Sequence, residues 1–400
     1  MGVMGITKMV NYNFALDLFE KGKVPPTYTS INNERIGESY NNQGFTTTNT
    51  LFDDITEVKC IPDFLTPLPH SDLKHLKILK IKRIQGFYID LSKYSSIADF
   101  LNDHFSSKQR ARLRSQLRRL ENCFDIDYKV YYGHIDKSHY DYLFDTLEIF
   151  IEKRFKQRGE AFDPTVNLAD VRERCYSMIN DKRASLHVLY NGVVPIDICL
   201  NYHFQDVLNH SIRSYDIDYA KFGLGNTDII QQLEWCLENG FQIFDFMWGD
   251  LPYKHFWSNK IYLYEHHIFY HSKSIIKQFL VACKAKVYKL KDHLDSRRAK
   301  SKNKNIFHGK DHAQKTSTGE RVKIEEINCK DATNELNRTG SLNINVDHDK
   351  YSWLKPLIYN FQHRHVVHSN NITVHQLNGN PSTYFVLGNK SAVKIIHQNL

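Results

Sequence analysis

The segment that decides the fold is "KFGLGNTDIIQQLEWCLENGFQIFDFMWGD", residues 221–250. It contains a glycine loop, a helical pattern over residues 227–239 that Gly240 would end, and a short apolar strand over 241–249. The preceding "VLNHSIRSYDID", residues 207–218, predicts another strand. Because a strand, a helix and a strand in this order form a crossover, we expect the two strands to be parallel in one sheet.

The flanking sequence extends this sheet and covers it with helices. Asn191-Gly192 separates two apolar runs and is a strong signal for a two-residue hairpin turn. Helical patterns precede the hairpin at residues 106–122 and 140–159, and "KIYLYEHHIFYH", 260–271, adds a strand after the crossover. These patterns predict an α/β (α+β) fold with a mixed sheet flanked by helices.

Length and composition limit the class of protein. With 400 residues of which 41% are hydrophobic, the chain can bury a large core and form more than one domain. No stretch reaches the roughly 18 uninterrupted apolar residues of a membrane helix, and the first residues lack a signal-peptide pattern. Seven scattered cysteines indicate reduced thiols. We therefore expect a soluble protein of the cytoplasm.

Positive charge is concentrated in one segment. Residues 273–310 hold 12 basic and 2 acidic side chains, while the whole chain has a net charge of +8. Such a segment can bind an anionic partner, either tRNA or lipid phosphate. A solvated helix that continues into a linker is the alternative interpretation.

A family resemblance covers residues 75–275. The residues that carry it are "FSSKQRARLRSQLRRLEN", "YDIDYAKFGLGNTD", and the pairs Asp245-Phe246, Gly249-Asp250 and Tyr253-Lys254 followed by Trp257. They resemble the GNAT N-acyltransferase superfamily, in its CelD-like branch that is related to the Fem-type aminoacyl transferases. The resemblance implies two GNAT-like halves, of which the first is degenerate and the second holds the site.

This resemblance and the composition together give a domain organisation. We predict an irregular lead-in at 1–50, a first degenerate GNAT-like half at 51–135, a GNAT-like acyltransferase domain at 136–275, a basic helix and linker at 276–340, and a small β-rich tail domain at 341–400.

The glycine loop is the candidate donor site. Gly223 and Gly225 remove side chains where a helix exposes unpaired N–H groups, and the helix dipole favours an anion there. Asn226 or Thr227 is the expected N-cap. A plain turn explains Gly-x-Gly equally well. The predicted cofactor-binding residues are Gly223, Leu224, Gly225, Asn226 and Thr227.

The turn after the second strand is the candidate catalytic site. Acyl transfer needs a proton acceptor and stabilisation of an oxyanion. We assign Asp250 as the base, Lys254 as the stabilising cation and Tyr253 as the acid, with Trp248 and Trp257 as substrate-binding residues. The alternative is structural: Asp250 caps the turn, Lys254 pairs with it, and the aromatic residues belong to the core.

Two nearby features are interpreted as structural. Asp245 lies within the apolar strand, so a buried hydrogen bond is the favoured role. The histidines of "HRHVVH", His363, His365 and His368, lack an acidic residue at useful spacing, and we predict no metal site. His363 and His365 alternate as they would on one face of a strand.

The resemblance implies transfer of an acyl group from acyl-CoA, as a co-substrate and not as a tightly bound cofactor. The expected acceptor is an amine or hydroxyl of a cell-envelope or polysaccharide precursor or of a small metabolite. One alternative is a Fem-like transfer from aminoacyl-tRNA. Another is an inactive GNAT-fold binding protein, because Ala220 stands where the superfamily's loop has Arg or Gln.

Overall fold

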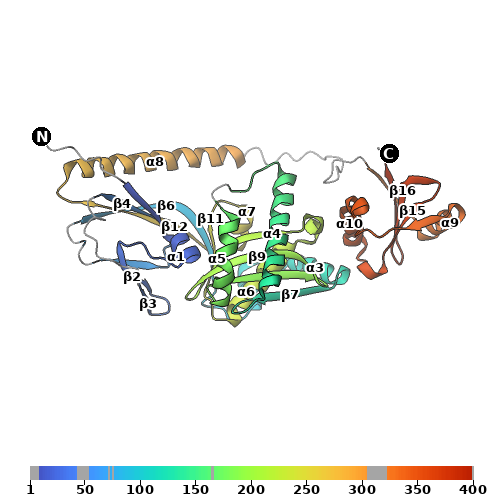
Figure 1. Cartoon of the computed structure of the whole chain (residues 1–400), viewed down its shortest axis with the longest axis horizontal. Helices are drawn as coiled ribbons and strands as arrows, with labels where there is room; N and C mark the ends of the chain where they lie inside the picture. The colour runs from blue at the N-terminus through green and yellow to red at the C-terminus, as the bar shows by residue number, and fades with distance from the viewer. Residues whose placement is uncertain are drawn as a thin grey trace. The chain divides into compact units, whose positions relative to one another are not determined.

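The computed structural model describes residues 9–42, 54–70, 73, 76–163, 166–303 and 322–398. It is a mixed α/β fold with sheets flanked by helices, as the sequence predicts (Figure 1). The chain divides into two compact units that interleave along the sequence. The first unit contains residues 1–93, 202–211 and 239–310, and the second contains 94–201, 212–238 and 311–400. The domain boundaries predicted from the sequence are contiguous, and the two units are not.

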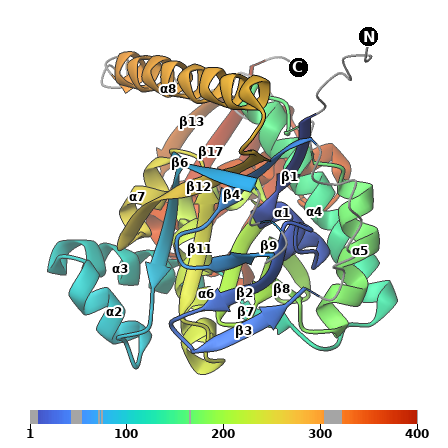
Figure 2. The ribbon, with the colours of Figure 1, turned by 90° about the vertical axis from the view of Figure 1, so that its left-hand side faces the viewer.

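The first unit is built on a mixed sheet in which the strands follow the order β1-β4-β12-β6-β11-β10. A three-stranded sheet of order β3-β2-β5 accompanies it. The long helix α8 runs beside β4, β6 and β12 (Figures 1 and 2). The elements are β1 Met9–Asn13, α1 Phe14–Lys21, β2 Tyr28–Asn33, β3 Glu38–Asn41, β4 Ile55–Ile61, β5 Thr66–Pro69, β6 Leu76–Asp90, β11 Ile243–Trp248, α7 Pro252–Trp257, β12 Lys260–His271 and α8 Ile275–Asn303.

The second unit contains a sheet of strand order β10-β9-β8-β7 and a five-stranded sheet of order β13-β17-β16-β15-β14. Strands β9 and β10 are divided between the two units. The first elements are α2 Ile97–His104, α3 Ser107–Cys123, β7 Ile126–Tyr131, α4 Lys137–Arg158, α5 Leu168–Asn180, β8 Ala184–Asn191, β9 Val194–Phe204, β10 Val207–Tyr215, η3 Ile217–Phe222 and α6 Leu224–Glu238. The later elements are β13 Val322–Ile327, α9 Cys329–Thr339, β14 Ser341–Asn343, η4 Asp349–Leu354, α10 Lys355–His365, η5 Ser369–Asn371, β15 Thr373–Leu377, β16 Asn380–Leu387 and β17 Ala392–His397.

The predicted crossover is confirmed. β11 pairs in parallel with β10, with Asn209 opposite Asp245, and antiparallel with β6 on its other side. The register of β11 against β6 shifts after Asp245, and Met247 and Gly249 there have φ values of 59° and 103°. This irregular end turns the chain from β11 into the candidate catalytic turn.

Local signals explain several elements. Ser106 begins α3 with a reciprocal capping box with Gln109. Gly159 ends α4 in the left-handed conformation. β15 and β16 flank the turn at Asn378-Gly379, as predicted.

Three predictions are corrected. Residues 9–42, expected to be irregular, form β1, α1, β2 and β3, because β1 pairs with β4 and α1 buries Phe14 in the core. Part of the predicted linker forms β13 and α9, which complete the five-stranded sheet and its cover. The strand predicted for His363 and His365 is the end of helix α10, whose Phe361 packs into the core of the tail.

Candidate functional site

A buried carboxyl group lies at the end of β11 in the first unit. Asp245 is buried, and its oxygens accept hydrogen bonds from Asn209 Nδ2 at 3.2 Å, the Met247 amide at 3.0 Å and the Tyr262 hydroxyl at 3.4 Å. Burial raises the pKa of Asp245 to about 7 even though these donors and Lys254 favour the ionised form. This carboxyl group therefore changes charge near neutral pH.

Lys254 is the buried cation of the same unit. Its Nζ donates to the carbonyl oxygen of Phe246 at 2.7 Å and to that of Trp248. Burial lowers the pKa of Lys254 to about 8, and the charge of Asp245 opposes that shift. The pKa values of the acid and the base therefore lie close together, which is a feature of functional sites as well as of buried ion pairs.

An aromatic shell produces this burial. The rings of Tyr262 and Tyr264 lie 4.8 Å apart, and Phe64 and Tyr88 contact Tyr262 edge-on at 5.6 Å and 5.5 Å. Gly86 pairs with Tyr262 across the sheet, and a Cβ at Gly86 would lie 2.3 Å from the tyrosine ring. Gly86 therefore makes room for the ring of Tyr262, whose hydroxyl donates to Asp245.

The residues predicted from the sequence are divided between the surface and the interior. Asp250 is exposed, and its Oδ1 lies 2.5 Å from His255 Nε2. Tyr253 is exposed and contacts the ring of Phe246 edge-on, whereas Trp257 is fully buried. The half-buried Trp248 lies against the ring of Tyr264.

Lys254 therefore interacts electrostatically with Asp245, while the described ion pair of Asp250 is with His255. Sequence reasoning named Lys254 but placed Asp245 among structural residues and did not single out Asn209 or Tyr262. The position of its carboxyl group inside an apolar strand was the sequence feature that could have indicated a functional role for Asp245.

The predicted donor loop lies in the second unit. Gly223 has φ of +73° after η3, and α6 begins at Leu224, before the predicted caps. A Cβ at Gly223 would lie 2.9 Å from Gln116 Nε2, and Asn226 Nδ2 donates to Gln116 Oε1 at 2.9 Å. Leu224 and Thr227 are buried in the first turn of α6. In this structure the side chain of Gln116 covers the loop.

A buried cluster of charged side chains lies beside Gly225. A Cβ at Gly225 would lie 3.3 Å from a guanidinium nitrogen of Arg213. Arg213 pairs with Asp228 at 2.7 Å and with Asp197, and both carboxyl groups are buried. Burial raises the pKa of both carboxyl groups, while Arg213 opposes that shift. This cluster was not anticipated, although Asp197 also interrupts an apolar strand.

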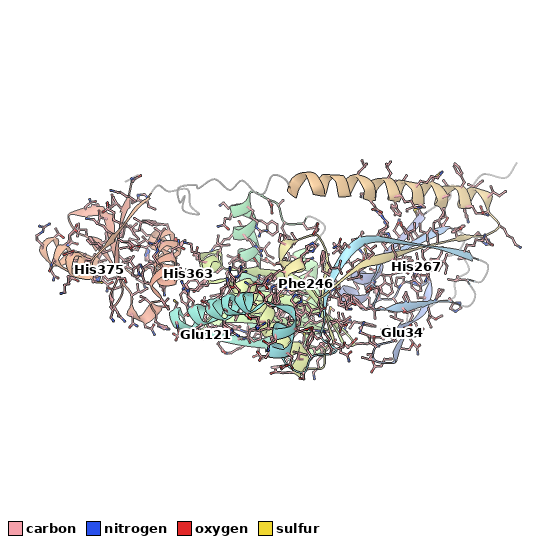
Figure 3. The ribbon with its side chains drawn as sticks, turned by 180° about the vertical axis from the view of Figure 1, so that it is seen from behind. Glu34, Glu121, Phe246, His267, His363 and His375 are labelled. Carbon is pink, nitrogen blue, oxygen red and sulfur yellow. The ribbon has the colours of Figure 1, made fainter. Side chains whose placement is uncertain are left out.

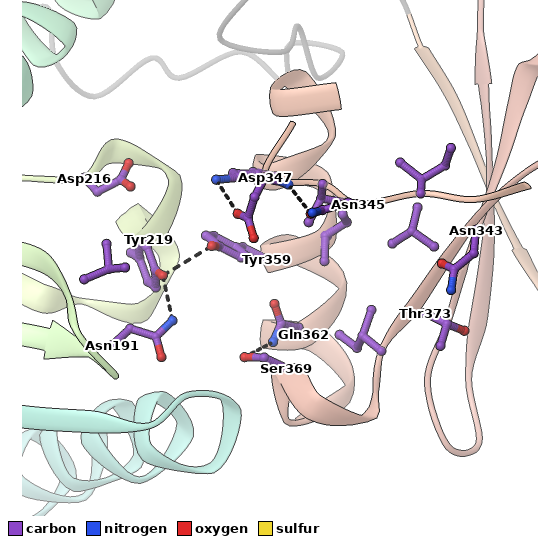
Figure 4. Close-up of a pocket in the computed structure, with 17 residues that line it drawn as sticks. Asn191, Asp216, Tyr219, Asn343, Asn345, Asp347, Tyr359, Gln362, Ser369 and Thr373 are labelled. Atoms are coloured by element: carbon purple, nitrogen blue, oxygen red, sulfur yellow. Dashed lines mark hydrogen bonds and ion pairs between the residues drawn. The ribbon is translucent and has the colours of Figure 1, made fainter. Parts of the chain in front are cut away.

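A cavity of about 470 Å³ lies in the second unit, beside η3 and therefore close in sequence to the donor loop (Figure 4). Tyr219 and Tyr359 face each other with 3.2 Å between their hydroxyl oxygens, and Asn191 Nδ2 donates to Tyr219 at 3.0 Å. Its lining also includes the ion pair of Lys355 with Asp347 at 2.9 Å. The volume is in the range of small-molecule sites.

The crossover and the mixed sheet flanked by helices define an α/β fold. Residues 107–255 match a family model described as an acetyltransferase (GNAT) domain. This match confirms the resemblance to the GNAT superfamily. No curated protein matches the chain in sequence.

Several solved structures match part of the chain at low sequence identity. FemX is 11% identical with a TM-score of 0.38, and the match covers 53% of this chain and 71% of FemX. L-PGS from Bacillus licheniformis is 13% identical with a TM-score of 0.35, covering 60% of this chain and 73% of that protein. A GCN5-related N-acetyltransferase from Kribbella flavida is 8% identical with a TM-score of 0.27, covering 56% and 70%. In the described part of the chain, no helix has the length and apolar character needed to cross a membrane.

Proposed function

We propose that the protein moves an acyl group from acyl-CoA to an amine or hydroxyl group, and that Asp245 and Lys254 are the ionisable centre of the reaction. The observation that carries this proposal is the burial of Asp245 and Lys254 at the end of β11, each held by hydrogen bonds, with pKa values shifted to about 7 and about 8. Between these two values the carboxylate and the ammonium coexist. A proton acceptor and a cation are the two groups that acyl transfer requires.

Lys254 suits the role of stabilising the oxyanion. Two of its three N–H groups are directed to the carbonyl oxygens of Phe246 and Trp248, which fixes the ammonium and leaves a third N–H. A Cβ on Gly249 would lie only 3.5 Å from Nζ, so the bare backbone of this glycine gives the thioester oxygen an approach to the ammonium.

Asp245 suits the role of proton acceptor. The nucleophile attacks the thioester carbonyl carbon, the C–S bond breaks as the oxyanion collapses, and the proton of the nucleophile passes through the Tyr262 hydroxyl to Asp245. The CoA thiolate leaves with the bonding electron pair and is then protonated. Asp250 and Tyr253, both exposed after β11, remain candidates for holding the acceptor, which we propose is a cell-envelope or polysaccharide precursor or a small metabolite.

The donor loop, residues 223–227, is the proposed contact for the CoA pyrophosphate. Gln116 must move for a phosphate to approach Gly223, because its amide occupies the space beside that glycine. The position of the Gln116 amide beside Gly223 favours the alternative of an inactive binding protein, because it fills the space that the donor phosphate would need. The basic helices α3 and α8 favour the other alternative, aminoacyl transfer from tRNA.

The test measures release of free CoA thiol from acetyl-CoA, with amine and hydroxyl acceptors, for the wild type, Lys254→Met and Lys260→Met. Lys260 is an exposed lysine of β12 and serves as the matched control. We expect turnover to fall by about 10²–10³-fold in Lys254→Met alone. Equal turnover in all three proteins would refute the role of Lys254. Transfer that occurs only with aminoacyl-tRNA, or no transfer with either donor, would establish one of the two alternatives.

A further inference from the structure

Helix α8 has one face that is fixed to the first unit. Val281 packs against Ile55 and Ile268 of the sheet, and Lys284 Nζ lies 2.7 Å from the carboxylate of buried Glu57. Arg83 lies over the ring of Tyr288, with 3.9 Å from its Cζ to the ring centroid, and pairs with Asp292 at 2.7 Å. These contacts determine which side of α8 faces the sheet.

The opposite side of α8 is an exposed apolar stripe. Residues three and four apart share one face of a helix. Phe279 is 68% exposed and Leu290 is 60% exposed, and side chains project from α8 away from the sheet (Figure 3). The stripe consists of the half-buried Cys283 and the exposed residues Ile276, Phe279, Leu280, Val287, Leu290 and Leu294. Apolar side chains gathered in this way on a surface mark an interaction site.

Lysines lie on both sides of the stripe. Helical geometry places Lys286 and Lys289 along one edge and Lys291 along the other, and all three are exposed. The chain continues with Arg297, Arg298 and further lysines, so the segment carries a large positive excess. A partner that binds this face must therefore offer an apolar surface to the stripe and negative charge to the lysines.

We propose that α8 binds an anionic lipid surface, lying in the interface with the stripe in the acyl region and the lysines at the headgroups. An apolar stripe with basic edges is the pattern of interfacial helices. Two copies of α8 would bring lysines against lysines at the edges of a shared seam, which disfavours self-association. Phe279 and Ile275 also make the apolar surface at one end of α8 wider than the narrow seam of a coiled coil. A polynucleotide could pair with the lysines but would leave the apolar stripe exposed to water.

The test is flotation of the full-length protein with vesicles of phosphatidylcholine alone or mixed with phosphatidylglycerol. The variant is Phe279→Glu combined with Leu290→Glu. The matched control is Val193→Glu, which makes the same kind of change at an 88% exposed apolar residue outside α8. We expect binding to the mixed vesicles only, a loss of at least about tenfold in the α8 variant, and retention in the control.

Several results would overturn the proposal. These are absence of binding to the anionic vesicles, equal binding to both vesicle types, and binding that survives in the α8 variant. Binding to tRNA in place of vesicles would assign the lysines of α8 to a polynucleotide. A dimer in sedimentation velocity that only the α8 variant disrupts would assign the stripe to a second copy of the chain. If the α8 variant melts below the wild type, the milder double substitution Ile276→Ser and Val287→Ser replaces it, and the same loss of vesicle binding is expected.

Discussion

The substitution Asp245→Asn tests whether the buried carboxyl group titrates near neutral pH. Burial raises its pKa from 3.8 to about 7, so the folded protein holds a proton that the unfolded chain has already lost. The carboxyl group of Asp245 binds more protons in the native state between these values, and its contribution to the stability of the wild type must therefore fall as pH rises from about 4 to about 7. Asparagine stays neutral and removes this dependence.

The magnitude follows from the shift. Each pKa unit corresponds to about 1.4 kcal/mol, and the native carboxyl group is half-ionised at about pH 7, so the wild type should lose about 2 kcal/mol relative to the variant between about pH 5 and pH 7. At the acidic end the variant should be less stable by about 1 kcal/mol, because its amide cannot accept from both Asn209 and Tyr262 as the carboxyl group does. The two stability curves should therefore cross.

The assay is urea denaturation of both proteins across this pH range, with Asp250→Asn as the control. Asp250 is exposed and lies just beyond the same strand, so its replacement removes a surface carboxylate and leaves the buried one in place. A stability difference between wild type and Asp245→Asn that stays constant from about pH 5 to pH 7 would refute the titration of Asp245 and the role proposed for it.

Three further predictions concern the same sites. If Asp245 and Lys254 are both needed in their charged forms, turnover should follow a narrow bell between about pH 7 and pH 8, and a pH-independent rate across this range would contradict the pairing. Gly86→Ala should cost about 1–3 kcal/mol in thermal unfolding and reduce turnover, because the new Cβ displaces the Tyr262 ring; an unchanged melting temperature would show that the ring has room. Gly223→Val should lower stability through its left-handed backbone and weaken acetyl-CoA binding in calorimetry, whereas full affinity in the folded variant would remove the loop from the donor site.

The local part of the fold could be predicted from the sequence. Gly240, Asn191-Gly192 and Ser106 each favour one backbone conformation, and the elements beside them end or begin as expected. The start of α6 was predicted too late, because Gly223 is followed directly by helical residues and needs no polar cap. The alternating histidines before Val366 were too few to distinguish a strand from a helix end.

The candidate site was only partly predictable. Lys254 stands out in the sequence because it follows a strand in a polar turn. The pKa of Asp245 depends on Tyr262 and Asn209, which reach it through strand pairings between segments that are distant in sequence. No local pattern contains that information. The burial of Trp257 also arises from packing that the turn itself does not reveal.

The interleaving of the two units constrains how the protein can fold during synthesis. β6 is made early, but its sheet neighbours β11 and β12 emerge only after most of the second unit has left the ribosome. An unpaired strand of this length is a surface for misassembly until they arrive. A fragment limited to the matched residues 107–255 would lack β6 and β12, leaving β11 and its buried acid exposed on one side. The nascent chain therefore depends on holding its first strands soluble until β12 is made.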